Sequence, residues 1–187
     1  MHFTLSDLIL DITQNAAESG AKLVEIDISE KMTGNSGSPE FRFNIRDNGK
    51  GMDTGELKLA QDPFVTDGVK HPGRKIGLGL PFMIQTAEQS GGGWDIKSEK
   101  GKGTEVCAWF DTGNVDTPPA GDIPGTFRTI LLFQGPDEMV IRRSRKGGGV
   151  DFQYELKKTE LSEILGGLDD TQSLLLLDQY LHSMEED

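Results

Sequence analysis

Asp11 and Asn15 form the first pair of side chains whose types and spacing suit chemistry. Their separation of four residues places both on one face of a helix. The amide oxygen of Asn15 is a hard ligand of the kind that Mg²⁺ prefers, and the carboxylate of Asp11 suits a base that orients or deprotonates a water molecule or an acceptor group. By itself the pair also fits an ordinary solvated helix face.

The stretch Asp47-Asn48-Gly49-Lys50-Gly51-Met52 directly follows a predicted strand. An ionised Asp47 only accepts hydrogen bonds, which suits the exocyclic amino group of adenine. Gly49 and Gly51 allow the backbone to approach a flat base and to adopt positive φ. Because Asp-Asn-Gly is also a common turn sequence, this stretch alone leaves both interpretations open.

Two further glycine motifs follow along the chain. Lys75-Ile76-Gly77-Leu78-Gly79-Leu80 predicts a glycine-rich turn at the start of a helix, where unpaired N–H groups and the helix dipole favour phosphate. It matches neither a Walker A loop nor the dinucleotide-binding fingerprint. Gly101-Lys102-Gly103-Thr104 places a hydroxyl at the start of a strand, although in isolation a tight hairpin turn is the simpler interpretation.

The pattern of apolar residues predicts the elements that position these motifs. An apolar stripe at helical spacing predicts a helix over 6–19, with Ser6 as its N-cap. Alternation and turn residues predict strands at 22–29, 40–46, 93–98 and 104–110, and helices at 53–61 and 77–90. Residues 62–76 show no periodicity, and a structureless segment of this length in a compact domain is usually either functional or disordered.

The C-terminal part begins with a segment rich in proline and glycine, 113–125, which predicts a linker. Beyond it we expect three strands and then helical structure, at 127–133, 139–144, 150–157 and 159–185, with a break near Gly166-Gly167. The predicted domains are therefore residues 1–112 and a C-terminal extension over 126–187. The order of elements predicts an α/β (α+β) two-layer sandwich, with helices on one face of a mixed sheet.

The composition limits the classes of partner. The chain of 187 residues has a formal charge of -12, whereas a protein that grips nucleic acid usually presents a basic face, so we expect no nucleic-acid partner. The single cysteine, Cys107, excludes an internal disulfide, and its apolar neighbours predict a core residue. No apolar run approaches about 18 residues and no basic leader is evident, which predicts a cytoplasmic protein without a membrane segment.

Together and in this order, the four motifs resemble those of the Bergerat-fold (GHKL) ATPases, such as histidine kinases, anti-sigma serine kinases, Hsp90, type II topoisomerases and mismatch-repair ATPases. The resemblance covers roughly residues 5–110 and implies the same sandwich and the binding of ATP with Mg²⁺. It implies roles for the matching residues: Asn15 binds Mg²⁺, Asp47 recognises adenine, Gly49 and Gly51 lie beside the base, Gly77, Leu78 and Gly79 face the phosphates, and Thr104 joins Asp47 at adenine, often through water. Met52 and Lys75 are further candidates for binding the nucleotide.

The chain departs from the family pattern at one catalytic position. Hydrolysing members carry Glu, and kinases often Asn, four residues before the metal-binding Asn, where this chain has Asp11. The shorter carboxylate reaches less far, so Asp11 is a candidate base only. The loop 62–76 corresponds to the lid over ATP, in which the basic candidates for phosphate contacts are Lys70, His71, Arg74 and Lys75. A solvated basic loop fits these residues as well.

Three functions are compatible with the motifs: a kinase or kinase-like regulator of a partner protein, a slow ATPase acting as a conformational switch, and a nucleotide sensor without turnover. The first helix begins within ten residues of the start, and none of His2, His71 and His182 lies in a kinase-type acceptor motif, so we expect phosphoryl transfer in trans. The apolar run 174–177 must pack on its own domain or supply an interface with a partner or a second copy.

Overall fold

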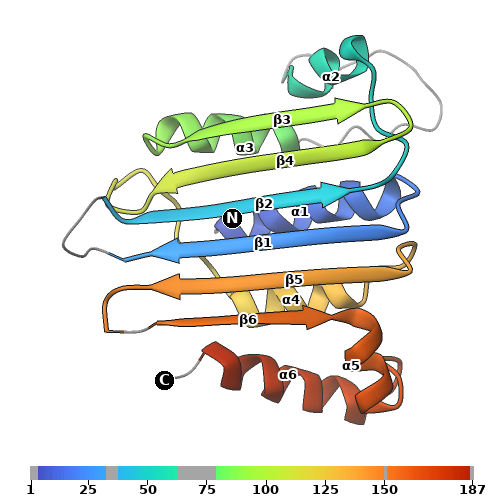
Figure 1. Ribbon diagram of the computed structural model, residues 1–187. Coiled ribbons are helices and arrows are strands. Elements are labelled where there is room, and N and C mark those ends of the chain that lie inside the picture. The colour runs from blue at the N-terminus through green and yellow to red at the C-terminus, as the bar shows by residue number, and fades with distance from the viewer. Residues whose placement is uncertain (1–3, 33–37, 63–78, 150, 186–187) are drawn as a thin grey trace.

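The computed structural model describes residues 4–32, 38–62, 79–149 and 151–185, within which six strands form one sheet. Their order is β3-β4-β2-β1-β5-β6 (Figure 1). β1 and β5 are parallel and all other neighbours are antiparallel, so the sheet is mixed. The strands are β1 (Leu23–Lys31), β2 (Glu40–Asp47), β3 (Gly93–Glu99), β4 (Gly103–Asp111), β5 (Glu138–Lys146) and β6 (Phe152–Lys157).

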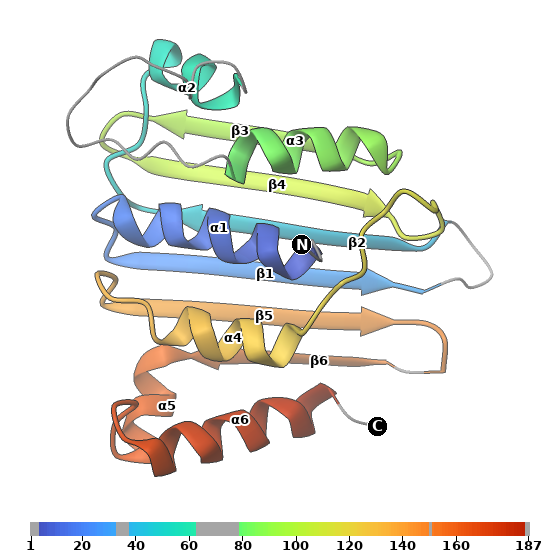
Figure 2. The same ribbon diagram turned by 180° about the vertical axis from the view of Figure 1, so that it is seen from behind.

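Helices cover one face of the sheet. α1, α3 and α4 lie over it in Figure 2, while α2 lies at the β3 edge and α5 and α6 at the β6 edge. The helices are α1 (Leu5–Glu18), α2 (Thr54–Gln61), α3 (Gly79–Gln89), α4 (Ile123–Leu131), α5 (Lys158–Leu165) and α6 (Thr171–Glu185). The predicted two-layer α/β sandwich is confirmed. Each helix of the described segments is too short or too polar to cross a lipid bilayer.

The start of α1 differs slightly from the prediction. Thr4 is the N-cap, and it forms a capping box with Asp7 in which each side chain accepts a hydrogen bond from the other residue's backbone N–H. Ser6, the predicted cap, is buried inside the helix, and its hydroxyl donates to the carbonyl of Ala120 at 2.6 Å. This bond anchors the segment that precedes α4 to the first turn of α1.

Strand alternation separates an apolar face from a polar one. Ile26, Ile45 and Val106 are aligned across β1, β2 and β4, are buried and belong to the core under the helices. Cys107 is only half-buried, because it lies between the buried Val106 and Ala108 and so points to the opposite face. The prediction of a core cysteine is therefore wrong. Strand alternation determines which face of the sheet a side chain occupies, even within a run of apolar residues.

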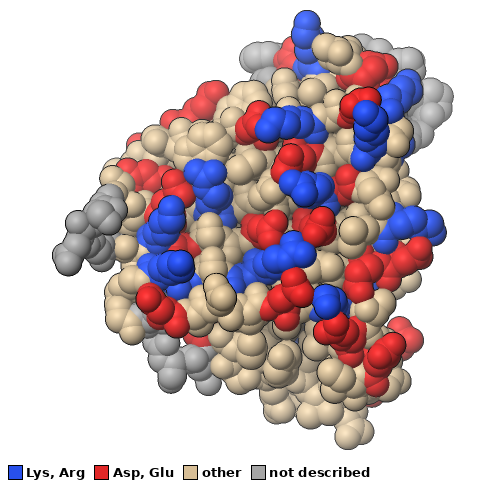
Figure 3. All heavy atoms as spheres, in the orientation of Figure 1, with Lys and Arg blue, Asp and Glu red and all other residues tan. Residues whose placement is uncertain are grey.

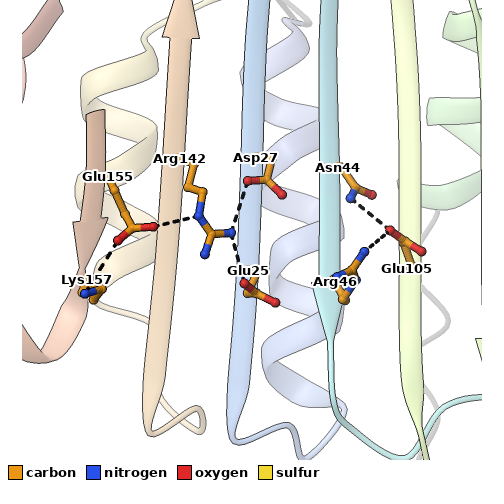
Figure 4. A network of polar contacts seen from close by, with 8 residues as sticks. All are labelled: Glu25, Asp27, Asn44, Arg46, Glu105, Arg142, Glu155 and Lys157. Atoms are coloured by element: carbon orange, nitrogen blue, oxygen red, sulfur yellow. Dashed lines mark hydrogen bonds and ion pairs between the residues drawn. The ribbon is translucent and has the colours of Figure 1, made fainter. Parts of the chain in front are cut away.

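The face without helices in Figure 1 carries many charged side chains (Figure 3). On β5, Arg142 contacts carboxylates from both neighbouring strands: Glu25, Asp27 and Glu155 (Figure 4). Arg46 on β2 pairs likewise with Glu105 on β4 at 2.6 Å. Opposite charges on adjacent strands stabilise a sheet by about 0.2–1 kcal/mol per pair, so this face is built to be polar.

The predicted strand at 127–133 is wrong, because most of these residues belong to helix α4. Ile123, Phe127 and Ile130 recur at helical spacing and are all buried. They lie on a helix that packs on both α1 and α6. Aromatic and β-branched residues favour a strand by propensity, but burial of one helical face overrides that preference here.

Local signals for α4 are present in the segment that we interpreted as a linker. The carboxylate of Asp122 accepts from the N–H of Gly125 at 2.9 Å, which caps the helix, and Pro124 occupies its first turn. The predicted linker 113–125 therefore ends inside α4. The C-terminal extension contains a helix, two strands and two further helices rather than three strands followed by a helix.

The C-terminal strands continue the same sheet, since β5 pairs with β1 and β6 pairs with β5. The predicted break in the final helical region is confirmed: Gly166, with φ of +73°, ends α5. α6 packs on α4 and buries Leu177 and Leu181. Leu175 and Leu176 of the same apolar run remain exposed, so the protein's own core buries only part of the run.

A buried ion cluster attaches the end of α6 to the sheet. The side chain of Arg143 is 2% exposed and contacts Glu30 of β1 at 2.7 Å and Glu185 of α6 at 3.0 Å. The hydroxyl of Tyr154 on β6 also donates to Glu185, at 2.5 Å. Two carboxylates compensate the buried guanidinium, so the cluster links three segments that are remote in the sequence.

Candidate functional site

A polar row lies at one end of the helix-covered face. Asp47, Thr104 and Ser98 are direct neighbours across β2, β4 and β3. The adjacent row on these three strands is apolar and buried: Ile45, Val106 and Ile96. Polar side chains at the margin of an apolar layer require partners, and these three find them in Ser19, in the loop after β2 and in one another.

Asp47 is 7% exposed, and its carboxylate is held at one oxygen. Oδ1 accepts from the backbone N–H of Gly49 at 2.8 Å and from the hydroxyl of Ser19 at 3.1 Å. Burial raises the pKa of Asp47, while hydrogen bonds from Gly49, Ser19 and the backbone of Thr104 partly oppose that rise. The loop after β2 and the end of α1 therefore both hold Oδ1 of this carboxylate.

The glycine loop after β2 packs too closely for side chains. Gly51 has φ of +59°, and a Cβ there would lie 2.0 Å from the carbonyl oxygen of Glu99. A Cβ at Gly49 would lie 1.9 Å from Oγ of Ser19. Space therefore requires glycine at both positions, and backbone conformation requires it again at Gly51.

Ser98 connects this loop to Thr104. The backbone N–H of Met52 donates to Oγ of Ser98 at 2.8 Å, and the hydroxyls of Ser98 and Thr104 lie 2.9 Å apart. Thr104 is the ladder partner of Asp47. The structure therefore brings together five predicted site residues, around one end of β2: Asp47, Gly49, Gly51, Met52 and Thr104.

The side of α1 that carries Asp11 and Asn15 leads to the same place. Both residues are exposed, and Ser19, which contacts Asp47, follows Asn15 by one further helical turn. A Cβ at Gly79, the first residue of α3, would lie 3.0 Å from Cβ of Asp11, so the start of α3 packs against this part of α1. Partial desolvation, together with the negative charge of a neighbouring aspartate, raises the pKa of Asp11.

The fold and the polar row match a known protein family. The family model described as "Histidine kinase-, DNA gyrase B-, and HSP90-like ATPase" matches residues 3–114. The chain belongs to this ATPase family. It is 30% identical over 106 residues to the sensor histidine kinase ZraS of Salmonella typhimurium, covering 57% of this chain and 21% of ZraS. It is 29% identical over 112 residues to a putative sensor protein of Shewanella frigidimarina, covering 60% and 16%.

This member of the ATPase family spans about a fifth of the length of those relatives or less. Its match to the ATP-binding part of sensor kinases agrees with the chemistry of the polar row. A carboxylate acceptor beside a hydroxyl, Asp47 beside Thr104, suits an adenine edge, and the glycines leave room for a flat base. The exposed amide of Asn15 offers the oxygen that Mg²⁺ prefers.

Some predicted residues lie outside the described part of the chain: Lys75, Gly77 and Leu78, and the lid residues Lys70, His71 and Arg74. Their phosphate-binding roles stay predictions. Sequence reasoning also missed two serines that contact the predicted site residues, Ser19 and Ser98. Ser19 could have been found from the sequence, since it follows Asn15 by four residues, which is about one helical turn. Ser98 is revealed only by strand pairing.

A shallow hollow of about 380 Å³ reaches the same end of the strands from the opposite, open face of the sheet. Its charged lining includes Arg46, Glu105 and Lys102. Arg46 is paired with Glu105 at 2.6 Å, and Lys102 with Glu99 at 2.7 Å. Asp47, Ser98 and Thr104 of the polar row also border this hollow.

Proposed function

We propose that this protein binds ATP with Mg²⁺ and acts as a kinase or kinase-like regulator on a partner protein. The observation that carries the proposal is the buried Asp47 beside Thr104, bordered by a loop whose glycines leave no space for side chains. Similarity to sensor histidine kinases supports transfer of phosphate to protein rather than to a small molecule. We place this activity in the cytoplasm.

In this proposal each part of the site has a limited task. Asp47 and Thr104 would bind the base, and the amide oxygen of Asn15 would hold Mg²⁺, which would supply charge neutralisation. The start of α3 at Gly79 offers unpaired helix N–H groups that suit the phosphates. Bound ATP supplies the phosphoryl group, and the protein contributes positioning and charge neutralisation, which account for most catalysis of this kind.

The acceptor in this proposal belongs to another molecule. His182 lies on α6 at the β6 edge, whereas α3 lies over the β3–β4 end of the sheet (Figure 2). The outer surface of α6 exposes Leu175 by 57%, Leu176 by 47% and Tyr180 by 44%. We propose that this apolar surface receives the partner protein or a second copy of the chain, with residues 126–187 acting as the partner-binding region.

One observation favours a second candidate, a slow ATPase that acts as a switch. Asp11 lies beside the start of α3, and its pKa is raised by desolvation and by the charge of Asp7. A carboxylate whose pKa moves toward neutrality becomes a better general base for a water molecule. Asp11→Asn abolishes release of phosphate if this candidate is right and leaves transfer to a partner intact if the kinase is right.

Nucleotide binding is tested first by thermal stabilisation with Mg·ATP. The wild-type protein should be stabilised, and Asp47→Ala should abolish the effect by removing adenine recognition. Asp95→Ala is the matched control, because Asp95 is an exposed β3 residue that pairs only with Lys97 among the described ion pairs. Absence of stabilisation of the wild type at millimolar Mg·ATP would contradict the proposal.

The fate of the phosphate is tested with γ-labelled ATP, using the purified protein alone and with the products of neighbouring genes. Label on a partner supports the kinase. Released phosphate alone supports the ATPase, and intact ATP supports a nucleotide sensor without turnover. Leu176→Glu should lower label transfer without changing the affinity for ATP, because it alters the exposed face of α6 and not the polar row.

A further inference from the structure

Ser19 is the C-cap of α1, and the single proton of its hydroxyl is shared between two acceptors. Oγ lies 2.7 Å from the carbonyl oxygen of Ala16 and 3.1 Å from Oδ1 of Asp47. Ser19 is also in close contact with Gly49, where a Cβ would lie 1.9 Å from Oγ. One serine therefore joins the end of α1, the carboxylate of Asp47 and the glycine loop.

The carboxylate of Asp47 has no charged neighbour to set its ionisation among the described residues. The groups that act on it are burial itself, the backbone N–H groups of Gly49 and Thr104, and the hydroxyl of Ser19. The other strands packed beside it contribute Val24 from β1 and Ser98 from β3, both uncharged. Ser19 is thus the one side chain of the described segments that donates to this carboxylate.

We propose that Ser19 is a positioning residue for the base-binding carboxylate: its hydroxyl holds Oδ1 and keeps Asp47 an ionised acceptor. The proposal rests on the proposed role of Asp47 in binding adenine. A hydrogen bond to the ionised form stabilises that form against the cost of burial. Without it, the carboxyl group takes up a proton more readily and gains freedom to rotate.

The consequence is a change in which base the site accepts. An ionised carboxylate accepts from the amino group of adenine and repels the carbonyl oxygen that guanine carries at the same position. A protonated carboxyl group has an O–H that donates to such a carbonyl. Ser19 therefore favours ATP over GTP by maintaining Asp47 in its acceptor form.

The test compares dissociation constants of ATP and GTP with Mg²⁺, measured by calorimetry from acidic to alkaline pH. Ser19→Ala should weaken ATP binding about tenfold at acidic pH, the loss of one hydrogen bond to a charged group, and should approach wild-type affinity at alkaline pH. Its preference for ATP over GTP should fall in the same acidic range. Ser98→Ala is the control, because it alters Met52 and Thr104 and should weaken binding by one factor at every pH.

A ligand-free measurement separates this inference from the proposed function. The side-chain carboxyl carbon of Asp47 is titrated by NMR in the wild type, in Ser19→Ala and in Ser19→Thr, which restores the hydroxyl. The midpoint should move to higher pH in the alanine variant and return toward the wild-type value in the threonine variant. An unchanged midpoint, or a loss of ATP affinity that is uniform over pH, overturns the role of Ser19. A shifted midpoint in a protein that binds no ATP overturns the proposed function instead.

Discussion

Gly51→Ala should destabilise the protein far more than Gly101→Ala, although both glycines have positive φ, of +59° and +82°. Alanine in the left-handed region costs about 1–2 kcal/mol at either position. Around Gly101 no heavy atom lies within 4 Å of the added Cβ, so no steric cost is added to the conformational one. At Gly51 the Cβ would lie 2.0 Å from the carbonyl oxygen of Glu99 and 2.9 Å from that of Gly103.

These obstacles are backbone atoms of β3 and β4, so no side chain can turn aside to relieve them. Displacing a packed backbone adds about 1–3 kcal/mol, which brings the expected total for Gly51→Ala to about 2–5 kcal/mol. The displaced loop also carries Met52, so ATP affinity should fall at least about tenfold. Gly101→Ala should bind ATP like the wild type, because Gly101 uses only its backbone N–H, which donates to the carbonyl of Lys50 at 2.7 Å.

The assay is urea unfolding of both variants and the wild type, followed by calorimetric titration with Mg·ATP. Equal unfolding free energies for the two alanine variants would refute the argument from close packing. A Gly51→Ala protein that is strongly destabilised but binds ATP normally would show that the loop packs as described and does not border the nucleotide.

Three other predictions concern burial, ionisation and the metal. Arg143→Met should lower the free energy of unfolding in urea by about 3–5 kcal/mol, because two carboxylates lose their buried partner. Arg142→Met on the open face should lower it by about 0–1 kcal/mol, and equal losses would contradict this account. Burial raises the pKa of Asp47, so its ionisation lowers the stability of the folded wild type as the pH rises from 3.8 through the raised pKa. The free energy of unfolding of Asp47→Asn should therefore increase relative to that of the wild type over this pH range. A difference that stays constant with pH would exclude this effect of burial. Asn15→Ala should weaken ATP binding more in Mg²⁺ than in EDTA, and equal weakening would exclude Asn15 as a metal ligand.

Much of the fold could be predicted because the burial pattern of most elements matches their local periodicity. β1 and β2 alternate between buried and exposed positions, and α1 buries residues at helical spacing. α4 could not be recognised in the same way. Its β-branched and aromatic residues favour a strand, whereas its Asp122 cap and its packing on α1 and α6 favour the helix. Cys107 was misplaced because an apolar run conceals which residues face the helices.

The candidate site also combines residues that are close in the sequence with residues that only strand pairing brings together. Asp47, Gly49, Gly51 and Met52 are close in the sequence, so their proximity follows from one short loop. The position of Thr104 beside Asp47 depends on the register of β2 with β4, which local sequence does not specify. Ser98 depends on a second register, that of β3 with β4. Lys75, Gly77 and Leu78 lie outside the described residues, so their roles stay predictions.

The sequence by itself determined the types of chemistry present: an acceptor carboxylate in a glycine loop, an amide one turn from an aspartate, and a hydroxyl at the start of a strand. Periodicity specifies which side of each element is buried, because that side must avoid water. The tertiary structure decided which buried sides meet. It alone placed Ser19 against Asp47, Ser98 against Thr104 and Arg143 between Glu30 and Glu185, since such contacts depend on packing and strand register between segments remote in the chain.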